Sequence, residues 1–584
     1  MKRISIITII LLCCVTALKA KSNIDSLQIA GLCKVWGLAK HYHPSVTKKK
    51  VDWDKALIDR YPEFKEENDF EAYNQKIGEI LNALGNNKET KIVTEELFQN
   101  IIDNDLSELE SFKFLSDTNK YVNRISFSWI NDSIFSKEIK YRLCKILTNY
   151  KPYKSKFLKG GMVLKHPENK FEELDSITEP YRMLGLFRYW NTINYYFPYK
   201  HLSDNNWDSV LVNAVSKFSE ADSYLKYIRE LMQLSSKIND SHGYYNYTTH
   251  KYFKKKTEVN DSLKKKEGYI PYNFKLFDST VVISKVLLDS SALCIGDTVI
   301  KINKTELKKY WRIYGDYNSH STENRKVSLC ESGLSNFYNS EFSFKIFKNN
   351  DTTIITESRV VDRETKVASK YRKPPFSYSI NENVGFVDLT QIKFGKLEKA
   401  LKEFKNKETV IFDMRGYPES MAPLALPHLL SRNKQDVASF YSPNKKYPGV
   451  FVKQPTKSQH YRFAIAKPFL FLRKQFKGKV VVLINAEAIS YSETVCMIFK
   501  AYCDDVTFVG TPTTGANGNI STIYVPGGMA FNFTSLDWHF PNGDQLQRIG
   551  IIPDIYVQET IEGIKLGKDE ILEAAIEYAK KSKQ

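Results

Sequence analysis

Residues 479–493 read Lys-Val-Val-Val-Leu-Ile-Asn-Ala-Glu-Ala-Ile-Ser-Tyr-Ser-Glu. The first six of them, Lys479–Ile484, are mostly β-branched and apolar, which predicts a strand buried on both faces. A helix is expected to follow, from about Ser490 to Tyr502. Ser490 therefore lies between a strand end and a helix start, where its hydroxyl is exposed and backbone N–H groups lie nearby to stabilise an anion.

Ser490 also has a purely structural interpretation. Serine is favoured at the N-cap of a helix, and Glu493 three residues later completes a capping box. The local pattern by itself favours this interpretation over a nucleophile.

The sequence around this stretch alternates between strands and helices from about residue 376 onward. The strands expected are Val384–Leu389, Thr409–Phe412, Val506–Gly510 and Ile520–Val525, and the helices are Phe394–Phe404 and Lys568–Lys580. Strands interleaved with helices predict an α/β layered core.

A different texture precedes this core, with short β-branched stretches such as Ser279–Val286 and Thr298–Ile302 separated by turn residues. Residues 292–303 read Ala-Leu-Cys-Ile-Gly-Asp-Thr-Val-Ile-Lys-Ile-Asn, which resembles the Leu-x-x-Gly-Asp-x-Ile-x-x-Ile-Asn stretch of PDZ domains. The resemblance implies a domain that binds an extended peptide by adding it to a sheet edge. A plain β-hairpin with a Gly-Asp turn is the alternative.

The first half of the chain contains an internal repeat. Trp36, Pro44, Trp53 and Asp54 recur 154 residues later, and the second set is Trp190, Pro198, Trp207 and Asp208. The pattern predicts a duplicated unit in which a helix ends near the proline and a second helix starts at Trp-Asp.

Bulk properties limit the class of protein. The chain has 584 residues, 42% of them apolar and 26% charged, so several globular domains are expected. The net charge of +18 is spread along the chain, with its densest cluster at Lys251–Lys266, and no nucleic-acid-binding motif accompanies it. Six cysteines lie beyond residue 20 without Cys-x-x-Cys spacing, so we expect buried free thiols and neither a zinc site nor a cofactor.

The first 20 residues carry the features of a secretion signal. Lys2 and Arg3 precede the apolar run Ile4–Leu18, and small residues follow at Ala17 and Ala20. Export to the periplasm or cell envelope is therefore expected, with no membrane span left after cleavage. A retained anchor helix is the alternative.

Four further motifs accompany Ser490: Asp-x-Arg-Gly at 413–416, Gly-x-x-Thr-x-Gly at 510–515, Gly-Ile-x-Pro-Asp at 550–554 and Asp-Ser-His at 240–242. Together they resemble the C-terminal-processing and tricorn-type serine peptidase family, over roughly residues 176–584. The resemblance implies that Ser490, and not Ser492, is the nucleophile. It also implies that the backbone N–H groups of Gly416 and Tyr491 stabilise the oxyanion.

The two branches of this family use different bases. The processing branch has a lysine just after the Thr-x-Gly segment, and here that position is Ala516. A serine hydroxyl needs a base to become a nucleophile, and the tricorn-type branch takes a histidine from its helical cap. The resemblance therefore implies His242 as the base and Ser241 as the residue that orients the imidazole. In the first repeat, Asn86–Lys88 takes the place of Asp-Ser-His, so that copy carries no base.

One position departs from the tricorn-type pattern. Three residues before Gly550 the family has a glutamate that completes a Ser-His-Ser-Glu tetrad, and this chain has Gln547. A neutral amide stabilises an imidazolium less than a carboxylate does. Either Asp544 or Asp240 then supplies the charge, or the site is a weaker triad.

These motifs predict a multidomain α/β protein with a helical cap, a PDZ-like domain and a ClpP/crotonase-like catalytic core. The expected segments are a signal peptide (1–20), a helical region with a degenerate repeat (21–175), the cap with Asp-Ser-His (176–262), the PDZ-like domain (263–375) and the peptidase core (376–584). The expected function is a serine endopeptidase acting on proteins or peptides. The alternatives are a catalytically silent relative that binds peptides and a ligand-binding protein on the same fold.

Overall fold

The computed structural model describes residues 26–65, 69–85, 91–152, 158–159, 163–164, 168–171, 176–247, 268–278, 280–348, 351–369, 375–430, 436–454 and 476–581. Three features of the sequence lie outside these ranges: the predicted signal at 1–20, the Asn86–Lys88 stretch and the whole basic cluster Lys251–Lys266. Within the described ranges, no helix has both the length and the apolar character needed to cross a membrane.

The core is a six-stranded sheet with the order β13-β14-β15-β18-β19-β23. Its strands are β13 (Ser377–Ser379), β14 (Val384–Asp388), β15 (Thr409–Asp413), β18 (Lys479–Ile484), β19 (Val506–Gly510) and β23 (Ile555–Tyr556). Only β13 is antiparallel to its neighbour. The strands predicted at 384, 409, 479 and 506 are confirmed.

Helices cover both faces of this sheet. On one face are α14 (Phe394–Glu403), α15 (Leu426–Leu430) and α16 (Tyr491–Tyr502), and on the other is α18 (Glu570–Lys581). Residues of β14, β15 and β18 alternate between the two hydrophobic clusters, which is why these strands are apolar throughout. The predicted α/β layering is confirmed.

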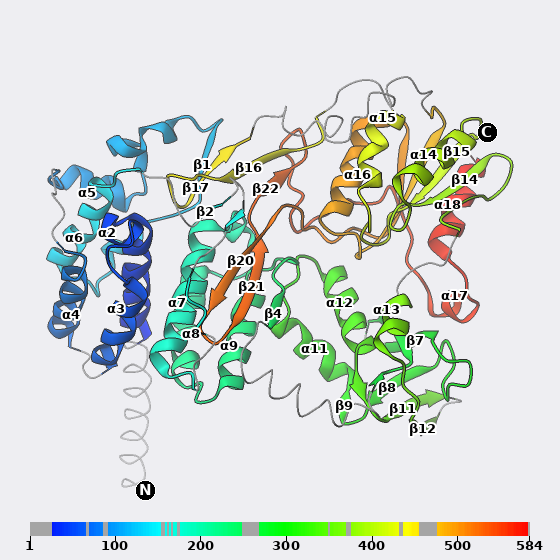
Figure 1. Cartoon of the computed structure of the whole chain (residues 1–584), viewed down its shortest axis with the longest axis horizontal. Helices are drawn as coiled ribbons and strands as arrows, with labels where there is room; N and C mark the ends of the chain where they lie inside the picture. Colours follow the sequence, from blue (N-terminus) through cyan, green and yellow to red (C-terminus); the bar gives the residue numbers. More distant parts are fainter. Residues whose placement is uncertain are drawn as a thin grey trace, which may run out of the picture.

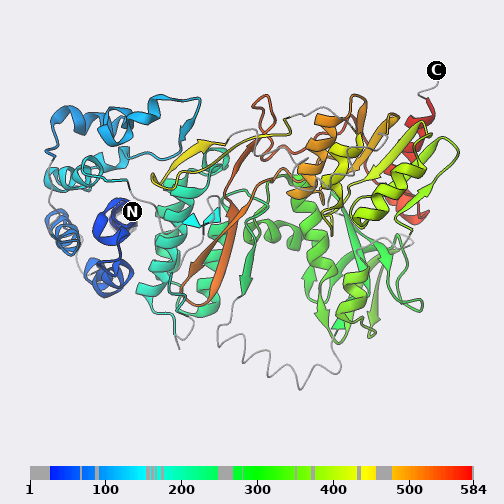
Figure 2. The ribbon, with the colours of Figure 1, turned by 45° about the horizontal axis from the view of Figure 1, so that its top comes forward.

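The helical cap is joined to the core by a β-hairpin. Its helices are α7 (Glu179–Tyr196), α8 (Trp207–Ser219) and α9 (Tyr224–Ser236). The hairpin of β20 (Ile520–Val525) and β21 (Met529–Thr534) leaves the core and packs on α7, as Figures 1 and 2 show. A third strand, β4 (Tyr245–Tyr247), pairs with β21 and comes from the cap itself.

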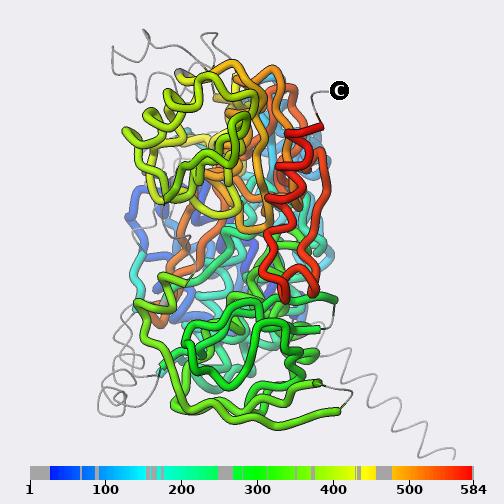
Figure 3. Tube along the Cα trace, turned by 90° about the vertical axis from the view of Figure 1, so that its right-hand side faces the viewer, coloured from blue at the N-terminus to red at the C-terminus, as the bar shows by residue number. Residues whose placement is uncertain are grey.

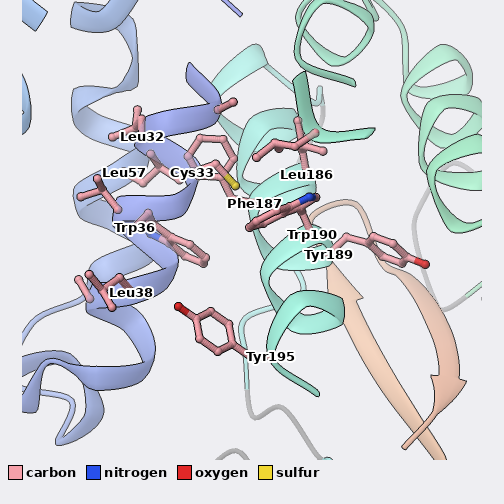
Figure 4. Close-up of a cluster of buried hydrophobic side chains, with 14 of the residues drawn as sticks. Leu32, Cys33, Trp36, Leu38, Leu57, Leu186, Phe187, Tyr189, Trp190 and Tyr195 are labelled. Carbon is pink, nitrogen blue, oxygen red and sulfur yellow. The ribbon is translucent and has the colours of Figure 1, made fainter. Parts of the chain in front are cut away.

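The internal repeat is confirmed by its hydrogen bonds. In the first copy, the indole N–H groups of Trp36 and Trp53 each donate to the other residue's carbonyl, at 3.1 and 2.9 Å. In the second copy, Trp190 and Trp207 do the same at 2.8 and 3.2 Å. The helix of residues 26–42 packs against α7, with Trp36 and Phe187 at the contact (Figure 4).

Two ion pairs connect the two copies. Lys34 of the first copy pairs with Asp208 of the second at 3.2 Å, and Arg188 of the second pairs with Asp54 of the first. Lys34 and Arg188 occupy equivalent positions of the repeat, as do Asp54 and Asp208. The two copies therefore contact each other through equivalent residues, as subunits of a two-fold dimer do.

The rest of the first copy also contacts the core. It contains α2 (Pro44–Thr47), α3 (Trp53–Arg60), α4 (Phe70–Asn82), α5 (Glu95–Ile102), α6 (Lys137–Thr148) and β1 (Tyr121–Asn123). Strand β1 completes a sheet with the order β1-β17-β16-β22, whose other strands are β16 (Ser439–Pro443), β17 (Val450–Lys453) and β22 (Asp537–His539). The tip of the β16–β17 hairpin packs on this region through Tyr447, which contacts Phe112, Phe114 and Tyr150.

A β domain lies beside the core. Its main sheet has the order β12-β11-β8-β7-β6, and β9 pairs with β8. The strands are β6 (Tyr272–Phe277), β7 (Thr280–Val286), β8 (Thr298–Ile302), β9 (Thr305–Glu306), β11 (Phe342–Lys348) and β12 (Asp351–Glu357), and the helices are α11 (Leu307–Tyr317), α12 (Glu323–Ser335) and α13 (Arg363–Ala368). A short pair, β5 (Gly268–Tyr269) and β10 (Tyr338–Asn339), lies outside this sheet. Figure 3 shows α17 (Ile561–Lys565) at the border between this domain and the core.

The outer edge of β6 is occupied by side chains of the same domain. The N–H of Phe274 donates to the Ser335 hydroxyl at 3.2 Å, and the N–H of Leu276 donates to the Glu331 carboxylate at 2.8 Å. Both acceptors lie on α12. A peptide that added to this edge would have to displace them.

The six cysteines of the described residues are all free. Cys33, Cys144, Cys330 and Cys496 are buried and Cys503 is partly buried, as expected. Cys294 is exposed, so for this residue the expectation of a buried thiol is wrong. It lies in the turn before β8, which the Gly296–Asp297 pair makes on the surface of the β domain.

The equivalence of the two copies predicts equal costs for equivalent substitutions. Trp36→Phe and Trp190→Phe each remove one indole N–H and its hydrogen bond to a carbonyl at a helix start, which should lower the free energy of unfolding by about 0.5–1.5 kcal/mol. Trp311→Phe, in the half-buried surface of the β domain, is the control and should change it by less than about 0.5 kcal/mol. Urea unfolding of the helical region checks this. A cost in one copy without a cost in the other would contradict the equivalence.

Candidate active site

Ser490 has an unusual backbone conformation at the N-cap of α16. Its φ is +57° and its ψ is −109°, a region that non-glycine residues seldom occupy. The conformation is held by its neighbours, because the Ser490 N–H donates to the Ala516 carbonyl at 2.9 Å. Strain of this kind persists where the surrounding structure enforces it, and it is frequent at catalytic residues.

Ser492 has a different environment. It is fully buried, and its hydroxyl donates to the carbonyl of Gly416 at 2.7 Å. This bond fixes the segment after β15 to the first turn of α16. Ser490 is partly exposed, so the structure distinguishes the two serines in the same way as the sequence motif does.

The Glu493 side chain binds the segment that contains Ser490. Its buried carboxylate accepts the N–H of Ser490 (3.3 Å), the N–H of Gly515 (2.7 Å), the N–H of Ala516 (3.0 Å) and the hydroxyl of Thr513 (2.7 Å). The capping glutamate of the sequence thus also joins α16 to the 513–516 loop. Burial raises its pKa to about 7, although the four donors act in the opposite direction.

The predicted oxyanion donors lie at the start of α16 and in the segment after β15. Tyr491 is the first residue of α16, where backbone N–H groups have no acceptor within the helix. The aromatic rings of Tyr491 and Tyr417 meet edge to face at 6.1 Å, which brings the Gly416–Tyr417 segment beside this helix start. The Gly416 N–H, however, donates to the Met414 carbonyl at 2.9 Å. It has to leave that acceptor before it can bind an oxyanion.

Arg415 fixes the end of β15. Its guanidinium contacts both carboxylate oxygens of Asp413 at 3.0 and 2.7 Å and both of Asp569 at 2.6 and 2.8 Å. Such paired contacts restrict orientation more than single hydrogen bonds do. The Asp-x-Arg-Gly motif therefore anchors Gly416 on its N-terminal side.

His242 reaches the core through the pairing of β4 with β21. In the observed register Tyr245 lies opposite Phe531 and Tyr247 opposite Met529. The N–H of Asn532 continues the ladder to the carbonyl of Tyr244 at 2.9 Å. The same register, extended to the end of β21, places His242 opposite Thr534.

The imidazole of His242 is buried and bonded to Thr534. Its Nδ1 lies 2.8 Å from the Thr534 hydroxyl, and that hydroxyl donates to the Asp240 carboxylate at 2.9 Å. A hydroxyl has one hydrogen, so Nδ1 must be the donor of the first bond and Nε2 carries the lone pair. Burial lowers the pKa of His242, while Asp240 raises it and Arg325 lowers it further.

Ser241 does not contact the imidazole through a hydrogen bond. Its hydroxyl accepts the N–H of Ser321 at 2.8 Å, and the Ser321 hydroxyl accepts the N–H of Ser241 at 2.9 Å. These two hydrogen bonds attach the Asp240–His242 loop to the segment before α12 of the β domain. The orienting contact expected from Ser241 is made by Thr534 instead.

Gln547 and Asp544 have different positions. The Gln547 side chain is buried and its Nε2 donates to Asp240 at 3.2 Å. Asp544 is exposed and accepts from Asn542 at 2.7 Å. Of the two carboxylates considered from the sequence, Asp240 is therefore the one in the His242 network.

Ser490 and His242 are brought to the same region by residues 516–518. Ser490 is bonded to Ala516, and Gly518 faces the methyl group of Thr534. Within the described part of the chain, no hydrogen bond joins the Ser490 side chain to His242. A cavity of about 540 Å³ between the β domain and the core is lined by Arg415, Gly416 and Tyr417, among other residues.

Sequence reasoning missed Thr534 and strand β21. The Pro-Gly-Gly turn at 526–528, followed by the alternating Met529–Thr534, was a usable signal for a hairpin partner of β20. No signal in the sequence indicated that β21 also pairs with β4, because this register joins residues almost 300 positions apart.

Comparison with known proteins bears on this arrangement. Residues 383–557 match the family model described as Peptidase family S41. The chain carries an S41 peptidase domain. The match contains Ser490, Gly416, Thr534 and Gln547, and the predicted resemblance to serine-type peptidases of this family is confirmed. A search of curated proteins found no match.

Solved structures resemble a large part of the chain. A structure of mature CPAF complexed with lactacystin is 16% identical and covers 70% of this chain and 98% of its own, with a TM-score of 0.50. The photosystem II D1 C-terminal processing protease is 12% identical and covers 67% and 98%, with a TM-score of 0.36. A putative peptidase from Parabacteroides merdae is 13% identical and covers 69% and 96%, with a TM-score of 0.38. The first of these likenesses shows that the S41 domain and its flanking regions share a fold with CPAF.

The buried Glu493 makes the stability of the S41 domain depend on pH. Because its folded-state pKa, about 7, lies above its ordinary value of 4.5, its contribution is complete below pH 4.5 and is lost as the pH rises through 7. Glu493→Gln should therefore abolish this part of the decrease between pH 5 and 8. Unfolding free energies of both proteins across that range measure it. Parallel pH curves for the two proteins would contradict the assignment.

Proposed function

We propose that the chain is a serine endopeptidase that hydrolyses peptide bonds through an acyl-enzyme at Ser490, with His242 as the general base. The proposal rests on two side chains, Ser490 and His242, that the fold holds in position. Ser490 is held in a strained conformation at a helix N-terminus, and His242 is held as the tautomer whose Nε2 accepts a proton. A serine needs such a base to act as a nucleophile at neutral pH.

The chemistry follows from these positions. Nε2 of His242 takes the Ser490 proton as the Oγ attacks the peptide carbonyl, and the imidazolium then protonates the leaving amine. Water attacks the acyl-enzyme with the same base, which releases the second product and restores Ser490. The helix start at Tyr491 provides N–H groups for the oxyanion.

The second oxyanion donor requires a local movement. The Gly416 N–H turns from the Met414 carbonyl toward the substrate oxygen when a substrate occupies the site. Losing one such donor typically costs about 10²–10³ in turnover. The Ser492–Gly416 bond limits this movement to a rotation of the peptide group between Arg415 and Gly416.

The finer domain assignments belong to the same proposal. Residues 376–584 are the ClpP/crotonase-like core, 176–262 the cap that supplies His242, and 263–375 a PDZ-like domain, in which Gly296 (φ +89°) makes the turn into β8. Export by the signal at 1–20 places the enzyme in the cell envelope, where proteins or peptides are its substrates.

Covalent labelling tests the nucleophile and the base. A fluorophosphonate should label the purified protein at one residue, Ser490. Labelling should be lost in Ser490→Ala and reduced by at least about 10³-fold in His242→Ala. Gel fluorescence and peptide mass mapping identify the labelled position.

Ser492→Ala is the matched control, since it removes a neighbouring hydroxyl of the same helix turn, and it should still be labelled. Labelling that survives Ser490→Ala but not Ser492→Ala would overturn the choice of serine. A wild-type protein that is not labelled between about pH 6 and 9 would indicate a catalytically silent relative.

The pH dependence tests the state of the base. Burial lowers the pKa of His242, so its neutral form persists to lower pH than that of an exposed histidine. The fluorophosphonate labelling rate should therefore rise with pH along a limb whose midpoint lies below about 6.5. A single midpoint above about 8 would instead indicate a lysine or another base.

A further inference from the structure

We propose that Thr534 and Asp240 are the positioning residues of His242, and that they take over the work that the tricorn-type pattern gives to a serine and a glutamate. The inference rests on the proposed function, since it concerns the base of that reaction. It assigns roles to two residues and explains why an amide stands at position 547.

The hydrogen bonds among His242, Thr534 and Asp240 have defined directions. Asp240 accepts the Thr534 hydroxyl (2.9 Å) and the Thr534 N–H (2.6 Å). Thr534 therefore has only lone pairs left for the imidazole, and the Nδ1–H of His242 points at them. The threonine hydroxyl passes the orienting effect of the carboxylate to the ring without taking the proton itself.

The Asp240 side chain is fully buried and also accepts the N–H of His242 at 3.2 Å and the amide of Gln547 at 3.2 Å. Three of these four donors point at Oδ1 of Asp240, and the fourth, the Thr534 N–H, points at Oδ2. A buried carboxylate that is bonded in this way has a fixed position beside the base.

The Nε2 of Gln547 points at Asp240, which an amide can do and a glutamate cannot. A glutamate there would put a second carboxylate against the first in a buried place, where one of the two would have to take up a proton. The amide is therefore the complement of a carboxylate that lies on the cap loop instead of on the core.

The loop of Asp240–His242 is also bonded to the β domain. The Asp240 N–H donates to the Ser319 hydroxyl at 3.0 Å, and Ser241 and Ser321 bond reciprocally. Gly243 leaves no space for a larger residue, because a Cβ there would lie 2.7 Å from Ser319. The loop of Asp240–His242 is thus held from the β domain on one side and from β21 on the other.

The two ring nitrogens of His242 therefore have different roles in the reaction. When Nε2 takes the Ser490 proton, the ring becomes positive while Nδ1–H stays bonded to Thr534. The negative charge of Asp240 stabilises this imidazolium through the hydroxyl and through space. The bond from Nδ1 to Thr534 also fixes the rotation of the ring, which leaves Nε2 free to take the proton.

The test compares three threonine variants by their fluorophosphonate labelling rates at pH 7.5. Thr534→Val removes the hydroxyl at nearly constant volume and should slow labelling by about 10–100-fold. Thr534→Ser keeps a hydroxyl and should restore the rate to within about threefold. Thr522→Val is the matched control, since Thr522 lies on the adjacent strand and its hydroxyl bonds Asn532; its rate should equal that of the wild type.

A second readout separates positioning from support of the fold. Asp240 and Arg325 are the charged groups that act on His242. Removing the negative one in Asp240→Asn should move the acidic limb of the labelling rate to lower pH as well as lower its plateau. Gln547→Glu should bring no gain in rate, because the carboxylate position is already filled.

The proposal is overturned if Thr534→Val is labelled at the wild-type rate, or if the acidic limb of Asp240→Asn stays in place. It is equally overturned if Gln547→Glu is labelled more than about tenfold faster than the wild type, which would show that position 547 lacks its proper carboxylate. Should Thr534→Val fail to fold, the labelling rates of Gln547→Glu and Thr534→Ser still test the proposal. A wild-type protein that is not labelled at Ser490 is a failure of the proposed function and is recognised separately.

Discussion

The pairing of β4 with β21 is the interaction on which the site depends. β4 belongs to the cap and β21 to a hairpin of the S41 domain, and their register joins residues 245–247 to residues 529–531. A slip by one residue would turn every side chain of the short strand to the opposite face. Because the hairpin is anchored in the hydrophobic cluster of the cap helices, the register fixes where His242 meets the core.

The other half of the site depends on buried polar contacts around one helix start. Glu493 joins Ser490 to the 513–516 loop, and Ser492 joins the same turn to Gly416. These bonds hold Ser490 in a conformation that it would not adopt in an isolated peptide. The proposed nucleophile, oxyanion segment and base thus come from three separate parts of the chain, and hydrogen bonds hold each of them in place.

The sequence predicted the local elements well, and it predicted the tertiary contacts of the site only in part. The runs at 384, 409, 479 and 506 are apolar because both faces of the sheet are covered, so their pattern was visible. The duplicated Trp-Asp units were visible for the same kind of reason, since two indoles that bond each other's carbonyls tolerate few replacements. The partner of His242 was not visible, because Thr534 becomes its neighbour only through a register between distant strands. Ser241 was assigned to the imidazole by resemblance, and the β domain binds its hydroxyl instead.

The central claim is that a cap histidine, held by Thr534, serves the serine at the start of α16. The most direct measurement is a crystal structure of the protein after reaction with a fluorophosphonate. The account predicts phosphonylated Ser490, with Nε2 of His242 within about 3.5 Å of its Oγ and Nδ1 still bonded to Thr534. A phosphonyl group on another serine, or a His242 ring whose Nε2 points away from Ser490, would contradict it.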